Sequence, residues 1–144
     1  MRLYLDNCCF NRPFDDQSTL TIRLETEAKL HIQAAIRAGE YALCWSYILD
    51  YENAANPLPE RCSEIQKWET LADAFVVETP AILTTMKEMI AIGCKPLDAL
   101  HLACAQALEC DYFLTVDKGI LKKARAIAGI RIMNPIDFVI EQGL

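Results

Sequence analysis

The stretch Lys95–Ile120, KPLDALHLACAQALECDYFLTVDKGI, decides the fold. Its first half predicts an amphipathic helix over 96–109, because Pro96 suits the first helical position and apolar side chains then recur at spacings of three and four. This apolar stripe consists of Leu97, Leu100, Cys104 and Leu108. Asp98 lies off the stripe, in the first turn of the helix.

The second half of the stretch predicts a buried strand over 112–116. The run YFLTV is apolar on both faces and rich in aromatic and β-branched residues, which is typical of a central parallel strand covered by helices on either side. Asp117 follows it directly. In open parallel α/β sheets ligands bind just beyond the carboxyl ends of the strands, so Asp117 occupies a favoured position.

Strands alternate with helices along the rest of the chain. Further strands are expected at 2–5, 41–45, 75–77 and 130–133. Helices are expected at 18–39, 47–53, 59–72, 80–92, 118–128 and 135–141, with a loop over 7–17. The 18–39 helix has an apolar stripe of Leu20, Leu24, Ala28, Ile32, Ala35 and Ile36, with Ser18 as its cap. The alternation predicts a single α/β domain over 1–144, with a mostly parallel sheet flanked by helices on both faces.

The composition indicates a soluble, cytoplasmic globular protein. The 144 residues are 53% hydrophobic and 24% charged, with no apolar run of membrane-spanning length and no secretory pattern at the start. The seven cysteines are odd in number and form no C-x-x-C pair, so we expect reduced thiols without disulfides. The net charge of −6 argues against a protein that coats nucleic acid through its overall charge, but not against an enzyme that meets it locally.

Four acidic residues share a type of location near strand ends. Asp6 follows the first strand, Asp117 follows the 112–116 strand, and Glu52 comes shortly after the 41–45 strand. Asp98 lies in the first turn of the helix that precedes the 112–116 strand. Carboxylates that converge on one rim raise each other's pKa unless a cation lies among them. A hard divalent cation such as Mg²⁺ or Mn²⁺ prefers such oxygen ligands.

Structural explanations for these residues compete with the metal site. Asp98 and Glu52, taken singly, suit helix N-termini through capping and the helix dipole, and a strand-end Asp is often a turn residue. Asp50 competes with Glu52, although two residues of a helix separated by about 200° cannot both face the site. His101 is interpreted as a partly buried helix residue.

The basic side chains after Asp117 also have two possible interpretations. Lys118, Lys122 and Lys123 either meet an RNA backbone or form a solvated basic face.

Four motifs together resemble the PIN-domain family, in particular its small VapC-type toxin ribonucleases. They are LYLDN at the N-terminus, S-x-x-x-x-x-E from Ser46 to Glu52, PLDALHLACA around Asp98 and FLTVDKGI around Asp117. The resemblance spans nearly the whole chain. It implies a five-stranded parallel sheet of order 3-2-1-4-5 and metal-dependent ribonuclease activity.

Matched residue by residue, the resemblance places the catalytic and metal-binding acids at Asp6, Glu52, Asp98 and Asp117, with Mg²⁺ or Mn²⁺ as the cofactor. Thr115 falls at the family's small hydroxyl position, and Lys118 is a further accessory candidate. The family often has Asn two residues after its first Asp. This chain has Cys8 there and Asn7 before it, which leaves the role of Asn7 open.

Two functions from different classes follow. The first is a metal-dependent endoribonuclease, the toxin of a toxin–antitoxin pair, whose partners are its RNA substrate, a cognate antitoxin and a second copy of the chain in a homodimer. The second is a catalytically silent PIN-like module that binds a protein partner and uses its acids as caps. A haloacid-dehalogenase-type phosphatase is disfavoured because Cys8 stands where that family needs a second Asp.

Overall fold

The computed structural model describes all residues, 1–144, and contains one parallel sheet. Its five strands are β1 (Arg2–Leu5), β2 (Ala42–Ser46), β3 (Ala74–Val76), β4 (Tyr112–Leu114) and β5 (Arg131–Met133). Their spatial order is β3-β2-β1-β4-β5, and every neighbouring pair is parallel. The predicted sheet and strand order are therefore confirmed.

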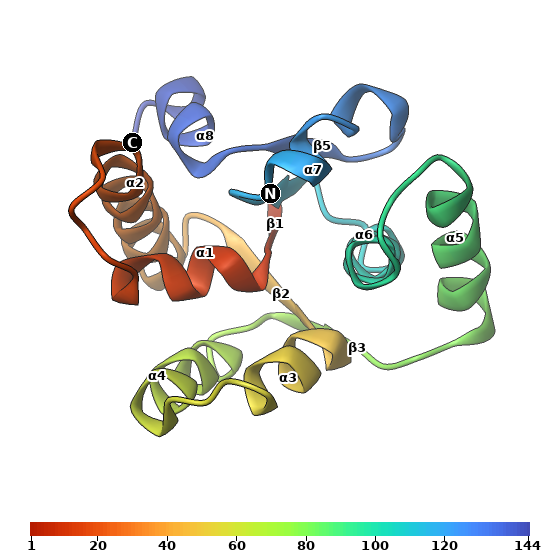
Figure 1. Cartoon of the computed structure of the whole chain (residues 1–144), viewed down its shortest axis with the longest axis horizontal. Helices are drawn as coiled ribbons and strands as arrows, with labels where there is room; N and C mark the ends of the chain where they lie inside the picture. The colour runs from red at the N-terminus through yellow and green to blue at the C-terminus, as the bar shows by residue number, and fades with distance from the viewer.

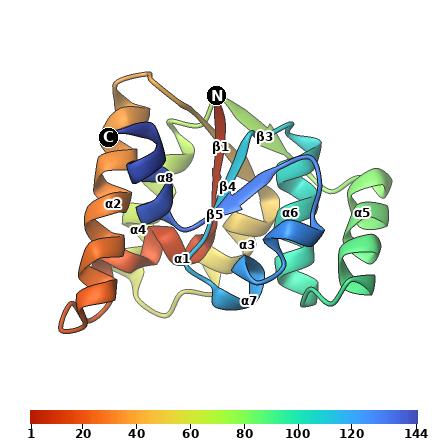
Figure 2. The same ribbon diagram turned by 90° about the horizontal axis from the view of Figure 1, so that it is seen from above.

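Helices cover both faces of the sheet. They are α1 (Asn7–Asn11), α2 (Leu20–Arg37), α3 (Tyr47–Ala54), α4 (Pro59–Glu69), α5 (Pro80–Ala91), α6 (Pro96–Ala107), α7 (Lys118–Leu121) and α8 (Pro135–Gln142), with short 3₁₀ turns η1 (Arg12–Phe14) and η2 (Ala124–Ala126). Figures 1 and 2 show α2 and α8 on one side of the strands and α6 on the other, with α5 outside α6. None of these helices is long and apolar enough to cross a membrane.

Large apolar side chains pack the sheet against its helices. Trp45, Tyr4, Phe10, Phe113 and Phe138 are all fully buried. The rings of Tyr4 and Phe113, on neighbouring strands, stack with centroids 5.2 Å apart. This packing holds β1 and β4 in one register, with Leu5 beside Leu114, so both strands end at the same edge.

The predicted loop over 7–17 is wrong, because the chain enters α1 directly after β1. The Asp6 side chain accepts a hydrogen bond from the Asn7 amide and caps α1. Phe10 on α1 is 1% exposed and lies against Trp45, with ring centroids 5.1 Å apart. Buried Phe10 and its buried neighbour Cys9 thus anchor a segment that has no apolar periodicity.

The apolar stripe predicted for α2 is wrong at its start. Leu20 and Leu24 are 60% and 49% exposed, and the helix begins at Leu20 without a side-chain cap from Ser18. The helix instead buries Glu25, Lys29 and Gln33 alongside the predicted alanines and isoleucines. Polar residues spaced four apart therefore occupy part of its inner face.

The predicted basic helix over 118–128 is also wrong. The chain forms only the four-residue α7 and then η2. Ile120 is the one buried residue of α7, so no continuous apolar face supports a longer helix. On α6, Leu97 is 46% exposed and does not join the predicted stripe.

Candidate active site

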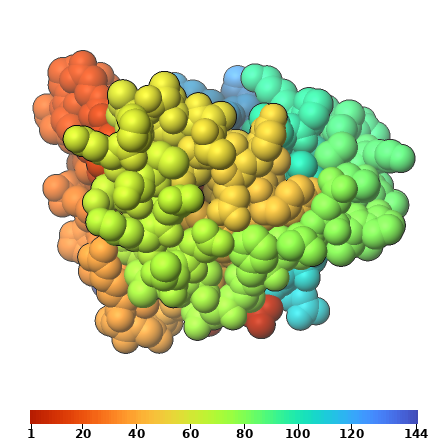
Figure 3. All heavy atoms as spheres, turned by 90° about the horizontal axis from the view of Figure 1, so that it is seen from below, coloured from red at the N-terminus to blue at the C-terminus, as the bar shows by residue number.

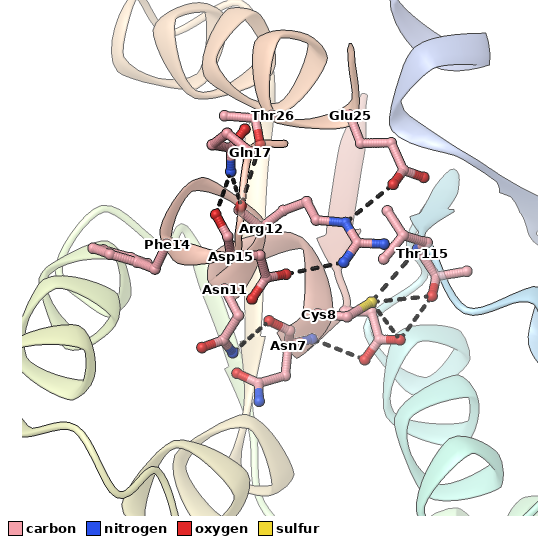
Figure 4. Close-up of polar contacts among 12 residues, drawn as sticks. Asn7, Cys8, Asn11, Arg12, Phe14, Asp15, Gln17, Glu25, Thr26 and Thr115 are labelled. Atoms are coloured by element: carbon pink, nitrogen blue, oxygen red, sulfur yellow. Dashed lines mark hydrogen bonds and ion pairs between the residues drawn. The ribbon is translucent and has the colours of Figure 1, made fainter. Parts of the chain in front are cut away.

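Asp6 stands at the carboxyl end of β1 and is 7% exposed. Its Oδ1 accepts the Asn7 amide at 2.8 Å, and its Oδ2 accepts the Thr115 hydroxyl at 2.8 Å. Figure 4 shows the Thr115 and Cys8 side chains close to each other, with Asn7 nearby. The Cys8 thiol donates to Oδ2 at 3.4 Å. These contacts hold the Asp6 carboxylate in one orientation.

Thr115 links Asp6 to Asp117. Its buried hydroxyl donates to Asp6 and accepts the Asp117 amide at 3.0 Å. The Asp117 carboxylate caps α7, because its Oδ1 accepts from Gly119 at 2.7 Å and from Ile120 at 3.2 Å. The predicted role of Asp117 as a structural cap is therefore real, and a metal role would have to coexist with it.

Asp98 lies in the first turn of α6 and is repelled electrostatically by Asp117 and Asp6. Its pKa is raised to about 6 by burial and by the negative charges of Asp117 and Asp6. The positive charges of His101 and Lys95 act in the opposite direction. Carboxylates from three separate elements thus repel one another at this edge of the sheet.

Glu52 reaches the same edge through His101. The imidazole Nε2 is hydrogen-bonded to the Glu52 carboxylate and lies 3.9 Å from Asp6 Oδ1. Its Nδ1 contacts the Tyr4 hydroxyl at 2.7 Å, and that hydroxyl lies 2.6 Å from the Ser46 Oγ. Burial alone would lower the pKa of His101, but the hydrogen bond to Glu52 and the charge of Asp6 raise it.

His101 is the residue that sequence reasoning missed. It is 1% exposed, rather than partly buried, and it is bonded on both ring nitrogens. It lies three residues after Asp98, so both side chains project from neighbouring turns on one face of α6. That spacing was the available signal.

Asp50 and Glu52 make contacts in different places. Asp50 Oδ1 accepts the Trp45 indole N–H at 2.9 Å, whereas Glu52 contacts His101. The two side chains therefore point to different surroundings, as predicted. We call Asp6, Glu52, Asp98 and Asp117 the acidic edge.

A basic cavity of about 240 Å³ adjoins Asp98. Lys95, Lys122 and Lys123 line it together with the backbone around Gly93 and Gly119. Gly93 has a φ of +101°, and a Cβ there would come within 2.8 Å of the Lys123 Nζ. The glycine thus permits both the turn and the approach of the lysine. Lys118 is exposed on α7, outside this lining.

No three His, Cys, Asp or Glu side chains lie close enough together to hold a metal ion among them. The carboxylates of Asp6, Asp98 and Asp117 therefore form no three-ligand group, although the resemblance placed all three at one metal site. Their chemistry still suits a hard cation, because all the donors are oxygens and their repulsion raises the pKa of Asp98.

Two further observations bear on whether this edge suits a metal ion. The buried Oδ1 of Asn7 has no hydrogen-bond partner and offers one more oxygen. Mg²⁺ commonly takes only one or two protein carboxylates and completes its shell with water and substrate phosphate. The residues present therefore fit Mg²⁺ or Mn²⁺ held by few protein ligands, and not a closed cage.

The strand order and the helices around it define a PIN-like fold. Compared as a sequence, the chain matches no family model and no curated protein. Solved structures nevertheless share its fold. VapBC2 from Rickettsia felis, in a crystal structure with a DNA fragment from its promoter, aligns at a TM-score of 0.61 with 11% identity, over 93% of this chain and 98% of that chain.

Two Fit structures align equally well. FitAcB from Neisseria gonorrhoeae has a TM-score of 0.61 with 13% identity, over 92% of this chain and 97% of that chain. FitAB bound to the IR36 DNA fragment has a TM-score of 0.62 with 15% identity, over 93% and 95%. Identities this low establish the shared fold alone.

Proposed function

We propose that this chain is a metal-dependent endoribonuclease that hydrolyses RNA phosphodiester bonds, with Mg²⁺ or Mn²⁺ as its cofactor. One observation carries the proposal: Asp98, whose pKa is raised by burial and by two other aspartates, borders a cavity lined by three lysines. Such a pairing offers oxygen ligands for a cation beside positive charge for a phosphate. The PIN-like fold supports the same chemistry.

The chain's own residues position the reaction. The Thr115 hydroxyl and the Asn7 amide hold the Asp6 carboxylate. Asp6, Asp98 and Asp117 would hold the cation, one or two of them directly and the others through its bound waters. His101 holds Glu52, which serves as a further ligand or orients the attacking water. Lys95, Lys122 and Lys123 attract the phosphate, and Lys118 meets the RNA backbone beside them. A bound divalent cation polarises the scissile phosphate and lowers the pKa of the attacking water.

Cleavage of a mixed RNA substrate with Mg²⁺, with Mn²⁺ and with chelator tests this proposal. Asp6→Asn and Asp117→Asn each remove one charge at nearly constant shape and should abolish metal-dependent cleavage. Asp50→Asn is the matched control, because an amide oxygen can still accept the Trp45 indole bond. Cleavage that survives chelator, or that both acidic-edge variants retain at the wild-type rate, contradicts the proposal.

A second candidate function is a silent PIN-like module that binds a protein. It is favoured by the capping bonds of Asp117 and by the lack of a three-ligand group. Thermal melts with and without Mn²⁺ separate the two functions, because a ligand that binds the native state raises its stability by mass action. A silent module shows neither a metal-induced shift nor cleavage.

We further infer a protein partner, an antitoxin that restrains the nuclease. The support is the fold shared with VapBC2 and FitAB, both of which are toxin–antitoxin complexes. Co-expression with the protein encoded beside this chain should give a stable complex and suppress cleavage. Light scattering of the purified chain then tests the homodimer. The absence of a complex on co-expression contradicts the antitoxin inference. A monomeric mass in light scattering contradicts the homodimer.

A further inference from the structure

The inner face of α2 carries a stripe of buried polar side chains. Glu25, Lys29 and Gln33 are spaced four residues apart and are 3%, 3% and 5% exposed. Buried polar groups in folded proteins are almost always hydrogen-bonded, because an unpaired one loses its hydration without compensation. Each member of the stripe can therefore be checked for its partners.

Glu25 is fully satisfied. Its Oε1 accepts from the Arg12 Nε at 3.0 Å, and its Oε2 accepts from the Asn134 side chain at 2.6 Å. Figure 4 shows Arg12 lying between Glu25 and Asp15, to which it donates at 2.9 Å. This end of the stripe is a closed structural network that joins η1, α2 and α8.

The other two members have no such partners. The Gln33 Nε2 is buried without a hydrogen-bond partner. No carboxylate pairs with the Lys29 ammonium, which instead lies 5.4 Å from the Phe10 ring centroid and 5.7 Å from that of Trp68. Burial and the charge of Arg37 lower the pKa of Lys29 to about 8, partly opposed by Cys9. Lys29 is thus an almost buried cation without a counter-charge.

Lys29 and Gln33 both contribute to the lining of a cavity of about 210 Å³ between α1, α2 and α4, although the Gln33 Nε2 itself is buried behind its surface. Figure 3 shows α4 at the molecular surface beside α2. Arg37 also lines this cavity, with its guanidinium 4.6 Å from the Trp68 ring centroid. The one acidic residue of the lining, Glu64, is bonded to Lys67 at 2.7 Å, and its side chain is 54% exposed. The cavity therefore has two positively charged side chains in its lining, Lys29 and Arg37, and its one carboxylate is already bonded to Lys67.

We propose that this cavity receives the carboxylate of an acidic side chain from a partner protein. A carboxylate would accept from the Lys29 ammonium, which lacks a counter-charge, and would be attracted by the positive charge of Arg37 in the same lining. The rim is apolar, with Phe14 43% and Leu30 45% exposed, so apolar residues beside the acid would cover it. Aromatic and apolar walls with few polar groups are typical of a specific binding pocket.

An RNA phosphate fits this cavity less well. A phosphodiester carries a nucleoside on each side, whereas the space is smaller than the ~300–1,000 Å³ of most small-molecule sites and suits one side chain. The exposed lysines beside Asp98 already provide the surface that a phosphate backbone needs. This inference deepens the proposed partner binding and rests on it, but not on the nuclease reaction.

An NMR titration of the full chain tests the inference with two probes, the blocked peptides acetyl-Leu-Glu-Leu-amide and acetyl-Leu-Gln-Leu-amide. The acidic peptide should shift the Gln33 side-chain amide and the Trp68 indole resonance, at concentrations where the amide peptide shifts neither. Trp45, the only other tryptophan, is the internal control, because its indole is bonded to Asp50. Lys29→Met should abolish the shifts, and Asp117→Asn should leave them unchanged.

Equal shifts from both peptides, or shifts that survive Lys29→Met, overturn the proposed carboxylate site. Shifts of Trp68 by a short single-stranded RNA, with none from the acidic peptide, assign the cavity to nucleic acid and also overturn it. If a partner co-purifies with the chain but Lys29→Met binds it normally, the cavity inference fails while the proposed partner stands. If the acidic peptide binds but no partner suppresses cleavage, the antitoxin proposal fails alone.

Discussion

Replacing Lys29 with methionine should make the protein more stable by about 2 kcal/mol near ~pH 7. The pKa of the buried ammonium falls from 10.5 to about 8. A shift of that size corresponds to about 3 kcal/mol of destabilisation when the lysine is charged. Cation–π attraction to the Phe10 and Trp68 rings offsets about 1 kcal/mol of it. Methionine has a similar shape and carries no charge, so the variant should gain the difference.

The stability gained by Lys29→Met should decrease as the pH rises. At pH values below the folded-state pKa of about 8, Lys29 is protonated in the folded and unfolded states alike, and the folded state is destabilised by the whole cost of burying the charge. Between about 8 and 10.5 the unfolded state binds a proton that the folded state lacks, so wild-type stability rises with pH. The methionine variant has no such group. The stability difference between the two proteins should therefore narrow as the pH rises.

Urea denaturation of both proteins, near ~pH 7 and near ~pH 10, measures these two effects. Tyrosine and cysteine titrations affect both proteins equally and cancel in the difference. The melting temperature should rise by about 4–8 °C for a chain of this size. A variant that is less stable than wild type, or a gap that stays constant with pH, would refute the reasoning. It would mean that Lys29 has an unseen partner in the folded state.

Three further changes test other parts of the structure. Asp117→Asn should lower the pKa of Asp98 from about 6 toward its ordinary value, as followed by carboxyl NMR, and an unchanged pKa would mean that the acidic edge is not a cluster. Phe10→Ala should lower the free energy of unfolding by about 3–5 kcal/mol, measured by urea denaturation, because it leaves a cavity beside the Trp45 ring. A loss under ~1 kcal/mol would contradict the packing of α1. In the native protein Cys8 should be alkylated much faster than its neighbour Cys9, because Cys9 is fully buried and has a raised thiol pKa. Mass spectrometry of the alkylated protein measures the two rates, and equal rates would contradict the placement of α1.

The sheet was predictable because its signal is local. The 112–116 run is apolar on both faces, and the alternation of strands with helices requires parallel strands. The motif resemblance then supplied the strand order, which the structure confirms. Strand ends are also local features. Asp6 and Asp117 could therefore be assigned to one edge from sequence.

Other parts of the site depend on residues that are distant in the chain. His101 lies between Tyr4 and Glu52, which are 97 and 49 residues away in the sequence. The same applies to α1, which is ordered by packing Phe10 on Trp45. Periodicity carries no information about such pairs, because it reports only which face of a segment is apolar.

By itself, the sequence determined the α/β class, the parallel sheet and the four acids near its carboxyl edge, because hydrophobic pattern and position after a strand are written in consecutive residues. Only the tertiary structure decided that the three aspartates repel one another without closing a cage, that His101 holds Glu52, and that α2 buries a lysine without a counter-charge. Those outcomes depend on electrostatics and burial among groups from separate elements, and such interactions exist only once the chain has folded.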